Sequence, residues 1–122
     1  MPTVLIVDDE ADTVMMLSSG LKLFGYESMM ATSGSEALEQ IDGRVPDAIV
    51  LDLMMPEMDG FEVTRRLRAN PGTKSVPIII ATAMAVLDAE DRSREAGATH
   101  FLYKPVSLSA LADLIRASLK NP

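Results

Sequence analysis

The fold is decided by the stretch Val4-Leu5-Ile6-Val7, which is followed directly by Asp8-Asp9-Glu10. Four apolar residues in a row, without polar alternation, are typical of a strand that is covered on both faces. Further along the chain, Ala48-Ile49-Val50-Leu51 and Ile78-Ile79-Ile80-Ala81 repeat this pattern. We therefore predict three central strands in a sheet that has helices on both sides.

Two weaker runs, Glu27 to Ala31 and Thr99 to Tyr103, complete a set of five strands with helical patterns between them. The more polar first run is expected at an edge of the sheet. Regular alternation of strands and helices implies a parallel sheet. Right-handed crossovers favour the strand order 2-1-3-4-5. The predicted fold is α/β, a flavodoxin-like doubly wound (βα)5 arrangement around a five-stranded parallel sheet.

The segments between the strands carry helix signals of unequal strength. The first has an apolar stripe at helical spacing, and Gly25 follows it as a C-terminal cap. The fourth, from about Val86 to Ala96, has small or polar residues at most positions, so its apolar stripe is the weakest. A weakly anchored helix can move. The stripe of the first helix is Val14, Leu17, Leu21 and Phe24, and the expected N-terminal signals of the other helices are Ser33 with Glu36, Asp59-Gly60, and Ser107.

Length and composition restrict the class of protein. The 122 residues suit one domain, 1–122, and 48% of them are hydrophobic. The lack of cysteine excludes a disulfide scaffold and thiolate chemistry. A net charge of −7 without a basic run disfavours nucleic-acid binding. The longest nearly apolar stretch, Val76 to Leu87, is too short to span a membrane, and no signal peptide is recognisable, so a cytoplasmic location is expected.

Polar residues interrupt the apolar pattern at the ends of the predicted strands. Asp8 and Asp9 follow the first strand and Asp52 follows the third, while Thr82 and Lys104 close the fourth and fifth. Ligands of open α/β sheets bind outside the carboxyl ends of the strands, where the strand order reverses. In the order 2-1-3-4-5 this point lies between the first and third strands. We therefore expect the three carboxylates to meet there, joined by the threonine and the lysine.

This set of side chains predicts a chemistry. Crowded carboxylates repel one another unless a proton or a cation joins them. An all-oxygen ligand set with positions left for water favours Mg²⁺ over a caged Ca²⁺. A metal ion, an ammonium group and a hydroxyl together suit a phosphoryl group, because they neutralise or hydrogen-bond its oxygens. One carboxylate can then attack phosphorus without a general base, since it is already ionised at neutral pH.

Five motifs are spread along the chain in a fixed order. They are Val7-Asp8-Asp9-Glu10, Asp52 to Gly60, Thr82-Ala83, Gly97-Ala98 and Lys104-Pro105. With these motifs the sequence resembles the receiver domain of two-component response regulators over essentially its whole length. The resemblance implies that Asp52 is the phosphoacceptor. It also implies that Asp8, Asp9 and Asp52 bind Mg²⁺ together with the backbone carbonyl of Met54.

The same resemblance implies a switch and its partners. Lys104 would pair with the phosphoryl group, Thr82 would bind it and shift inward, and Phe101 would be the switch aromatic. The peptide bond before Pro105 would be cis. The expected donor is a sensor histidine kinase or a phosphotransfer protein. The expected recipient is an output protein or domain, or a second copy of the chain, bound through the fourth helix, fifth strand and fifth helix.

Three positions depart from the commoner family pattern. Phe101 lacks the hydroxyl of the usual tyrosine, so packing of its ring would have to carry the signal alone. Met54 and Met84 are apolar where many family members are polar. Our hypothesis is that these two side chains cover the phosphoryl group and hinder the attacking water, which would make self-dephosphorylation slow.

Several residues also have structural interpretations. Asp8 and Asp9 could simply cap the first helix. The methionines at 15, 16, 29 and 30 are expected to fill the core, and those at 54, 55 and 58 lie in a loop where exposure is plausible. The cluster Arg65-Arg66-Arg68 is interpreted as a solvated helix face. His100 is interpreted as structural, because it lacks a helical metal-binding partner.

Two other functions compete with a signalling receiver that catalyses only its own phosphorylation and dephosphorylation. A Mg²⁺-dependent phosphatase of the haloacid dehalogenase type would also use an aspartyl phosphate, but its two nucleophile-loop aspartates are two residues apart, whereas Asp8 and Asp9 are adjacent. A flavodoxin-like flavin carrier would need a phosphate-binding loop after the first strand, where this chain places three acids.

Overall fold

A computed structural model describes residues 1–83 and 87–120, except for the side chain of residue 120. Five strands alternate with five helices over these residues, which confirms the predicted α/β class. The strands are β1 (Thr3–Val7), β2 (Glu27–Ala31), β3 (Ala48–Leu51), β4 (Ile78–Thr82) and β5 (His100–Tyr103). The helices are α1 (Ala11–Leu23), α2 (Gly34–Gly43), α3 (Gly60–Ala69), α4 (Ala89–Ala96) and α5 (Leu108–Lys120).

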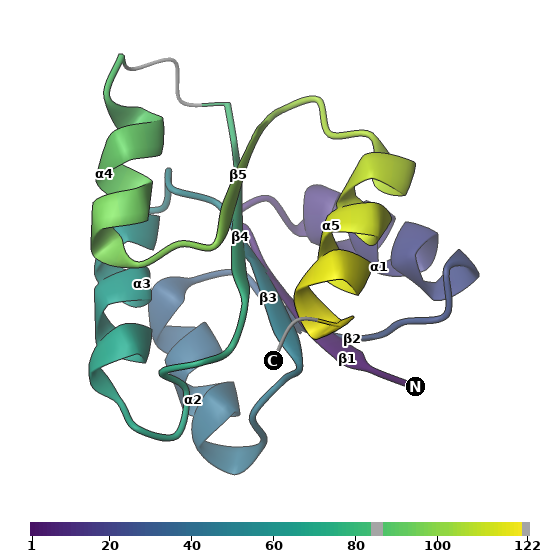
Figure 1. Ribbon diagram of the computed structural model, residues 1–122, viewed down its shortest axis with the longest axis horizontal. Coiled ribbons are helices and arrows are strands. Elements are labelled where there is room, and N and C mark those ends of the chain that lie inside the picture. Colours follow the sequence, from purple (N-terminus) through teal and green to yellow (C-terminus); the bar gives the residue numbers. More distant parts are fainter. Residues whose placement is uncertain (84–86, 121–122) are drawn as a thin grey trace.

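The sheet is parallel throughout and has the order β2-β1-β3-β4-β5, as predicted. Helices α1 and α5 cover one face, and α2, α3 and α4 cover the other (Figure 1). The more polar strand β2 lies at an edge, again as predicted. The chain order reverses between β1 and β3, which pair with Val7 opposite Leu51. The carboxyl ends of these two strands therefore open onto the same edge of the sheet.

The sheet separates two hydrophobic clusters. One contains Leu5, Val7, Ile49 and Leu51 together with residues of α2 and α3, and the other contains Val4, Ile6, Val50 and Ile79 with residues of α1 and α5. Strands β1, β3 and β4 contribute to both clusters by alternation, and all of their residues are buried. Burial on both faces explains why these strands have continuous apolar sequences.

The cap signals are largely observed, and the start of α4 is the main difference. Ser33 Oγ accepts a hydrogen bond from Glu36 N at 3.1 Å, and Asp59 Oδ1 accepts one from Glu62 N at 2.9 Å. Helix α4 begins at Ala89, later than predicted. Leu87 and Asp88 form a turn, and residue 86 lies outside the described residues. The buried residues of α4 are small, Ala89, Ser93 and Ala96, which agrees with its weak apolar stripe.

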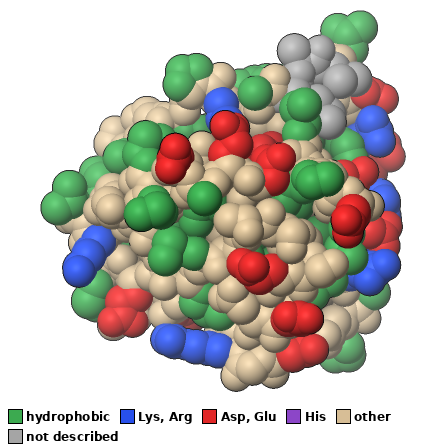
Figure 2. All heavy atoms as spheres, turned by 180° about the vertical axis from the view of Figure 1, so that it is seen from behind, with side chains coloured by type: hydrophobic (Ala, Val, Ile, Leu, Met, Phe, Trp, Pro, Cys, Tyr) green, Lys and Arg blue, Asp and Glu red, His purple; other side chains and the backbone are tan. Residues whose placement is uncertain are grey.

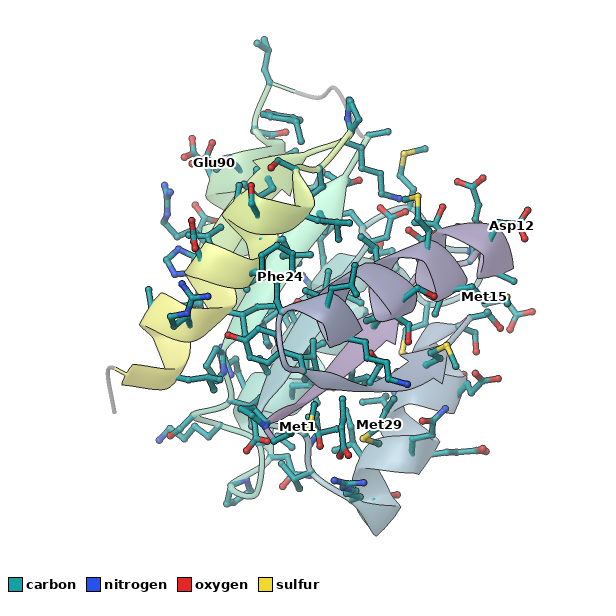
Figure 3. The ribbon with its side chains drawn as sticks, turned by 90° about the vertical axis from the view of Figure 1, so that its right-hand side faces the viewer. Met1, Asp12, Met15, Phe24, Met29 and Glu90 are labelled. Atoms are coloured by element: carbon teal, nitrogen blue, oxygen red, sulfur yellow. The ribbon has the colours of Figure 1, made fainter. Side chains whose placement is uncertain are left out.

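The expectation that four methionines fill the core is wrong for three of them. Met15, Met16 and Met30 are 61%, 60% and 47% exposed, whereas Met29 is partly buried against the core. Figure 3 views the molecule from the side of α1 and α5 and labels Met15 on α1 and Met29 on β2. Spacing alone did not separate these positions, because methionine tolerates both environments.

The three arginines of α3 differ in their surroundings. Arg65 and Arg66 form ion pairs with Glu62 at the surface, as expected of a solvated face. Arg68 is half-buried and donates instead to the carbonyls of Thr73, Lys74, Val76 and Gly97, at 2.7 to 3.3 Å. Its burial lowers the pKa of the Arg68 guanidinium from the usual value. The side chain thus connects the end of α3, the following loop and the end of α4.

No described helix is both long enough and apolar enough to cross a membrane. On the face shown in Figure 2, acidic and basic side chains alternate along the edge formed by α3 and α4. Ion pairs account for part of this alternation, including Arg94 with Glu90 at 2.8 Å on α4.

Candidate functional site

The acidic residues after β1 and β3 meet at one edge of the sheet. Asp8 follows β1 directly and Asp52 follows β3, and Asp52 N donates to Val7 O at 3.0 Å, which continues the pairing of the two strands. Carboxylate oxygens of Asp8, Asp9 and Asp52 all lie within 4.8 Å of one another. The expected convergence of these three side chains is therefore observed.

The three carboxylates differ in their surroundings. Asp8 and Asp52 are 3% and 5% exposed, whereas Asp9 faces solvent. Asp8 Oδ1 accepts a hydrogen bond from Glu10 N at 2.9 Å, and Asp52 Oδ1 accepts one from Met54 N at 3.2 Å. Backbone donors thus hold one oxygen of each buried carboxylate, while Asp9 leaves the site open to solvent on one side.

Lys104 reaches the same point from the end of β5. Its Nζ donates to Asp8 Oδ2 at 2.5 Å and to Asp52 Oδ2 at 3.2 Å. Burial is the largest single influence on this ammonium and lowers the pKa of Lys104. The hydrogen bonds and charges of Asp8 and Asp52 outweigh burial, so the net effect is a raised pKa. Lys104 is therefore a fixed positive charge at neutral pH.

The neighbouring end of β4 supplies Thr82, which is fully buried. Lys104 N donates to Thr82 O at 2.9 Å, so the backbone of the lysine is tied to the threonine. Phe101 is half-buried and packs against the cluster that contains Ile80. The peptide bond between Lys104 and Pro105 is cis, as the resemblance implied.

These motifs occur together in a known family, and the sequence matches the response regulator receiver domain over residues 4–116. The chain belongs to this family.

Individual relatives agree with this assignment. The chain is 40% identical over 120 residues to the transcriptional regulatory protein PrrA of Mycobacterium tuberculosis, covering 98% of this chain and 51% of the relative. Among solved structures, the chemotaxis protein CheY4 of Vibrio cholerae has a TM-score of 0.91 and 33% identity, with 98% of this chain and 99% of that chain covered. The signal receiver domain of a histidine kinase from Syntrophus aciditrophicus has a TM-score of 0.91 and 32% identity, covering 98% and 91%. The chain spans about half the length of PrrA.

The donor set of this receiver domain fits a hard divalent cation. Three carboxylates face one ammonium group, so negative charge remains uncompensated at the site. All of the carboxylate ligands offer oxygen, and the exposed side at Asp9 leaves room for water, as Mg²⁺ requires. The residues present therefore suit the magnesium ion that the family implies.

The loop between β3 and α3 holds Asp52 in the receiver domain by close backbone packing. Gly60 N donates to Leu53 O at 3.0 Å. A Cβ atom at Gly60 would lie 2.4 Å from Asp52 O and 2.8 Å from the Leu53 Cα, so only glycine fits there without a backbone shift. Leu53 and Met55 are buried in the core, which fixes the loop from the other side.

The structural interpretation of the acidic pair is only partly supported. The N-cap residue of α1 is Glu10, which forms no side-chain cap. Asp8 binds the Glu10 backbone but also the Lys104 ammonium, so a capping role alone does not account for its position.

His100 is half-buried at the start of β5 and belongs to none of the acidic groupings found among the described residues.

Exposure was plausible for the methionines of the loop after Asp52, and Met54 is 52% exposed, whereas Met55 is buried. Met84 lies outside the described residues. Tyr103 was not singled out in the sequence. It is 53% exposed, and its ring contacts that of Phe101. Strand alternation could have revealed it, because residues 101 and 103 must share a face of β5.

Proposed function

We propose that this receiver domain, residues 1–122, accepts a phosphoryl group from a phosphohistidine onto Asp52 and thereby switches a protein surface. The observation that carries the proposal is the convergence of three carboxylates and Lys104, with the buried Asp52 in contact with the lysine at 3.2 Å. Among the described residues, no other group of acidic side chains combines a buried carboxylate with two neighbouring carboxylates and a lysine contact.

The transfer needs little from the protein beyond charge and position. A carboxylate oxygen of Asp52 forms a bond to phosphorus while the bond from phosphorus to the donor imidazole nitrogen breaks, and this nitrogen keeps the electron pair. Asp8, Asp9, Asp52 and the backbone carbonyl of Met54 would hold Mg²⁺, which would neutralise negative charge on the phosphoryl oxygens. Met54 N already points at Asp52 and holds one of its oxygens.

Lys104 has the central role among the side chains of this chain. In the present state it bridges Asp8 and Asp52. After transfer the phosphoryl oxygens carry more negative charge than the acyl phosphate oxygens of Asp52, so the ammonium group moves its contact to them. The hydroxyl of Thr82, on the neighbouring strand, donates a hydrogen bond to a phosphoryl oxygen.

The switch follows from these two movements. Lys104 and Thr82 are joined by a backbone hydrogen bond, so both strand ends respond together. An inward shift of Thr82 leaves space that the ring of Phe101 enters, and the surface of α4, β5 and α5 changes shape. The small buried residues of α4 support this choice of surface, because little apolar area holds the helix in place.

The partners follow from this chemistry. A histidine kinase or a phosphotransfer protein supplies the phosphoryl group, and an output protein or domain, or a second copy of the chain, reads the changed surface. The relatives support more than one kind of output, since one is named a transcriptional regulator, another a chemotaxis protein and a third a receiver of a histidine kinase.

The test uses Mg²⁺ and acetyl phosphate as a small donor, with intact-mass spectrometry as the readout. We expect a gain of one acid-labile phosphoryl group in the native chain and none in Asp52→Asn. The matched control is Asp59→Asn, in the same loop, because asparagine also caps helices well and the aspartate has no part in the site. Continuous release of phosphate without a stable adduct would instead indicate a phosphatase. Phosphorylation of Asp52→Asn would overturn the assignment of the acceptor.

A further inference from the structure

Tyr103 lies where the acidic site meets the surface. It is the last residue of β5 and directly precedes Lys104, and it is opposite Thr82 in the pairing of β4 with β5. Its side chain is 53% exposed, although both of these neighbours are wholly or largely buried. A movement of either neighbour therefore acts on Tyr103 through one peptide bond or one pair of strand residues.

The ring of Tyr103 also contacts the interior through Phe101. The two ring centroids are 4.9 Å apart, and the planes are inclined at 78°, an edge-to-face arrangement. Phe101 also packs against buried residues of the hydrophobic core. The pair thus connects the core to a side chain that is half-exposed to solvent.

The contact between the Phe101 and Tyr103 rings can be broken or rearranged at low energetic cost. Edge-to-face aromatic pairs are weak and have several geometries of similar energy. Strand β5 is at the edge of the sheet, and its residues are only partly buried, in contrast with those of β4. The ring pair can therefore rearrange without disrupting the central strands.

We propose that Tyr103 transmits the state of the Asp52 site to the surface. The Phe101 ring holds the Tyr103 ring in place only while Asp52 is unmodified. The proposal rests on the proposed function. When Phe101 moves inward, the edge contact is lost, and the Tyr103 ring and hydroxyl become available to a partner that offers an apolar surface and a hydrogen-bond acceptor.

The composition of the chain allows a direct test. The sequence has no tryptophan and two tyrosines, and Tyr26 is only 5% exposed. In a Tyr26→Phe background the tyrosine fluorescence comes from Tyr103 alone. Acrylamide, which is uncharged and therefore insensitive to the acidic site, is used to quench it before and after treatment with acetyl phosphate and Mg²⁺, and mass spectrometry measures phosphorylation in the same sample.

We expect the quenching constant to rise on phosphorylation by up to about twofold, since a ring pair that separates can at most expose a half-exposed side chain fully. Phe101→Leu removes the ring contact, so its constant should be high from the start and should not change further. The matched control, Phe24→Leu, alters another partly exposed phenylalanine at the end of α1 and should leave the rise intact.

The possible failures are distinguishable. Phosphorylation of Asp52 with an unchanged quenching constant overturns the role of Tyr103 and leaves the proposed function standing. A chain that takes up no phosphoryl group overturns both. If Phe101→Leu does not fold, Tyr103→Trp provides a second reporter, whose emission maximum should shift to longer wavelength on phosphorylation. An unshifted maximum in the phosphorylated protein also overturns the inference.

Discussion

Replacement of Lys104 by methionine tests the electrostatics of the site most directly. The substitution keeps most of the aliphatic side chain and removes the ammonium group that bonds to Asp8 at 2.5 Å and to Asp52 at 3.2 Å. Two buried carboxylates then face each other and Asp9 without a positive charge. We expect the free energy of unfolding to fall in the absence of divalent cations, because a buried charge that loses its partner is strongly destabilising.

The size of the loss has an upper bound. The variant can relieve the repulsion by protonating one carboxyl group, and for an unperturbed aspartic acid this costs about 4 kcal/mol at pH 7 and about 1.5 kcal/mol at pH 5. Loss of two hydrogen bonds between charged groups predicts about 2 kcal/mol or more. We therefore expect a loss of about 2–4 kcal/mol at pH 7 and less than about 2 kcal/mol at pH 5.

The effect of Lys104 on the free energy of unfolding at alkaline pH follows from its raised pKa. A group with a folded-state pKa above its unfolded value stabilises the protein fully below the unfolded pKa, here 10.5, and loses that effect as the pH rises through the folded pKa. The difference between the native chain and Lys104→Met should therefore shrink as the pH rises above 10.5 and through the folded-state pKa of Lys104.

The assay is urea denaturation at pH 5 and pH 7, with and without Mg²⁺. Lys74→Met is the matched control, because it makes the same change in net charge at an exposed lysine that takes part in none of the described ion pairs. Its effect should stay within about 0.5 kcal/mol. Equal losses for the two variants, or a loss for Lys104→Met that is the same at both pH values, would refute the reasoning. Added Mg²⁺ should recover part of the loss by binding the carboxylates.

Four further outcomes are expected. Asp9→Asn should stabilise the metal-free protein by about 1 kcal/mol, because like charges within 4.8 Å cost about 0.9 kcal/mol per pair even in water, and it should weaken the stabilisation by Mg²⁺ in urea titrations. Gly60→Ala should cost about 1–3 kcal/mol through overpacking and slow phosphorylation by acetyl phosphate. Arg68→Met should lower the free energy of unfolding by about 2 kcal/mol, whereas the exposed Arg65→Met should cost less than about 1 kcal/mol. Met54→Asn should shorten the lifetime of the phosphorylated protein, measured by the loss of its phosphoryl group, and an unchanged lifetime would count against a covering role for this half-exposed side chain.

The fold was predictable because its signals are local and repeated. Continuous apolar runs such as Ile78 to Ala81 are typical of strands that are covered on both faces, and the parallel topology then brings Asp8 and Asp52 to one edge. The candidate site could be assembled from the sequence for the same reason. Its members follow strand ends, and the sheet places strand ends together whatever the intervening loops do.

What the sequence did not reveal depends on non-local or irregular contacts. Arg68 binds carbonyl groups of a loop and of a distant helix end, and no spacing pattern records such partners. Helix α4 begins three residues later than predicted, because it has no side-chain cap and little apolar stripe to define its start. Met15 and Met30 were wrongly predicted to lie in the core, because methionine occurs both in the core and at the surface.

The two sides of the site depend on different halves of the interior. Asp52 is followed by Leu53 and Met55, which are buried with α2 and α3, whereas Lys104 lies between Leu102 and Val106, which pack with α1 and α5. The contact between Asp52 and Lys104 therefore requires both halves to be packed. Under the proposed function, a chain with only one half folded would lack the ammonium group beside the acceptor carboxylate, so the capacity to accept a phosphoryl group would arise only when folding is complete.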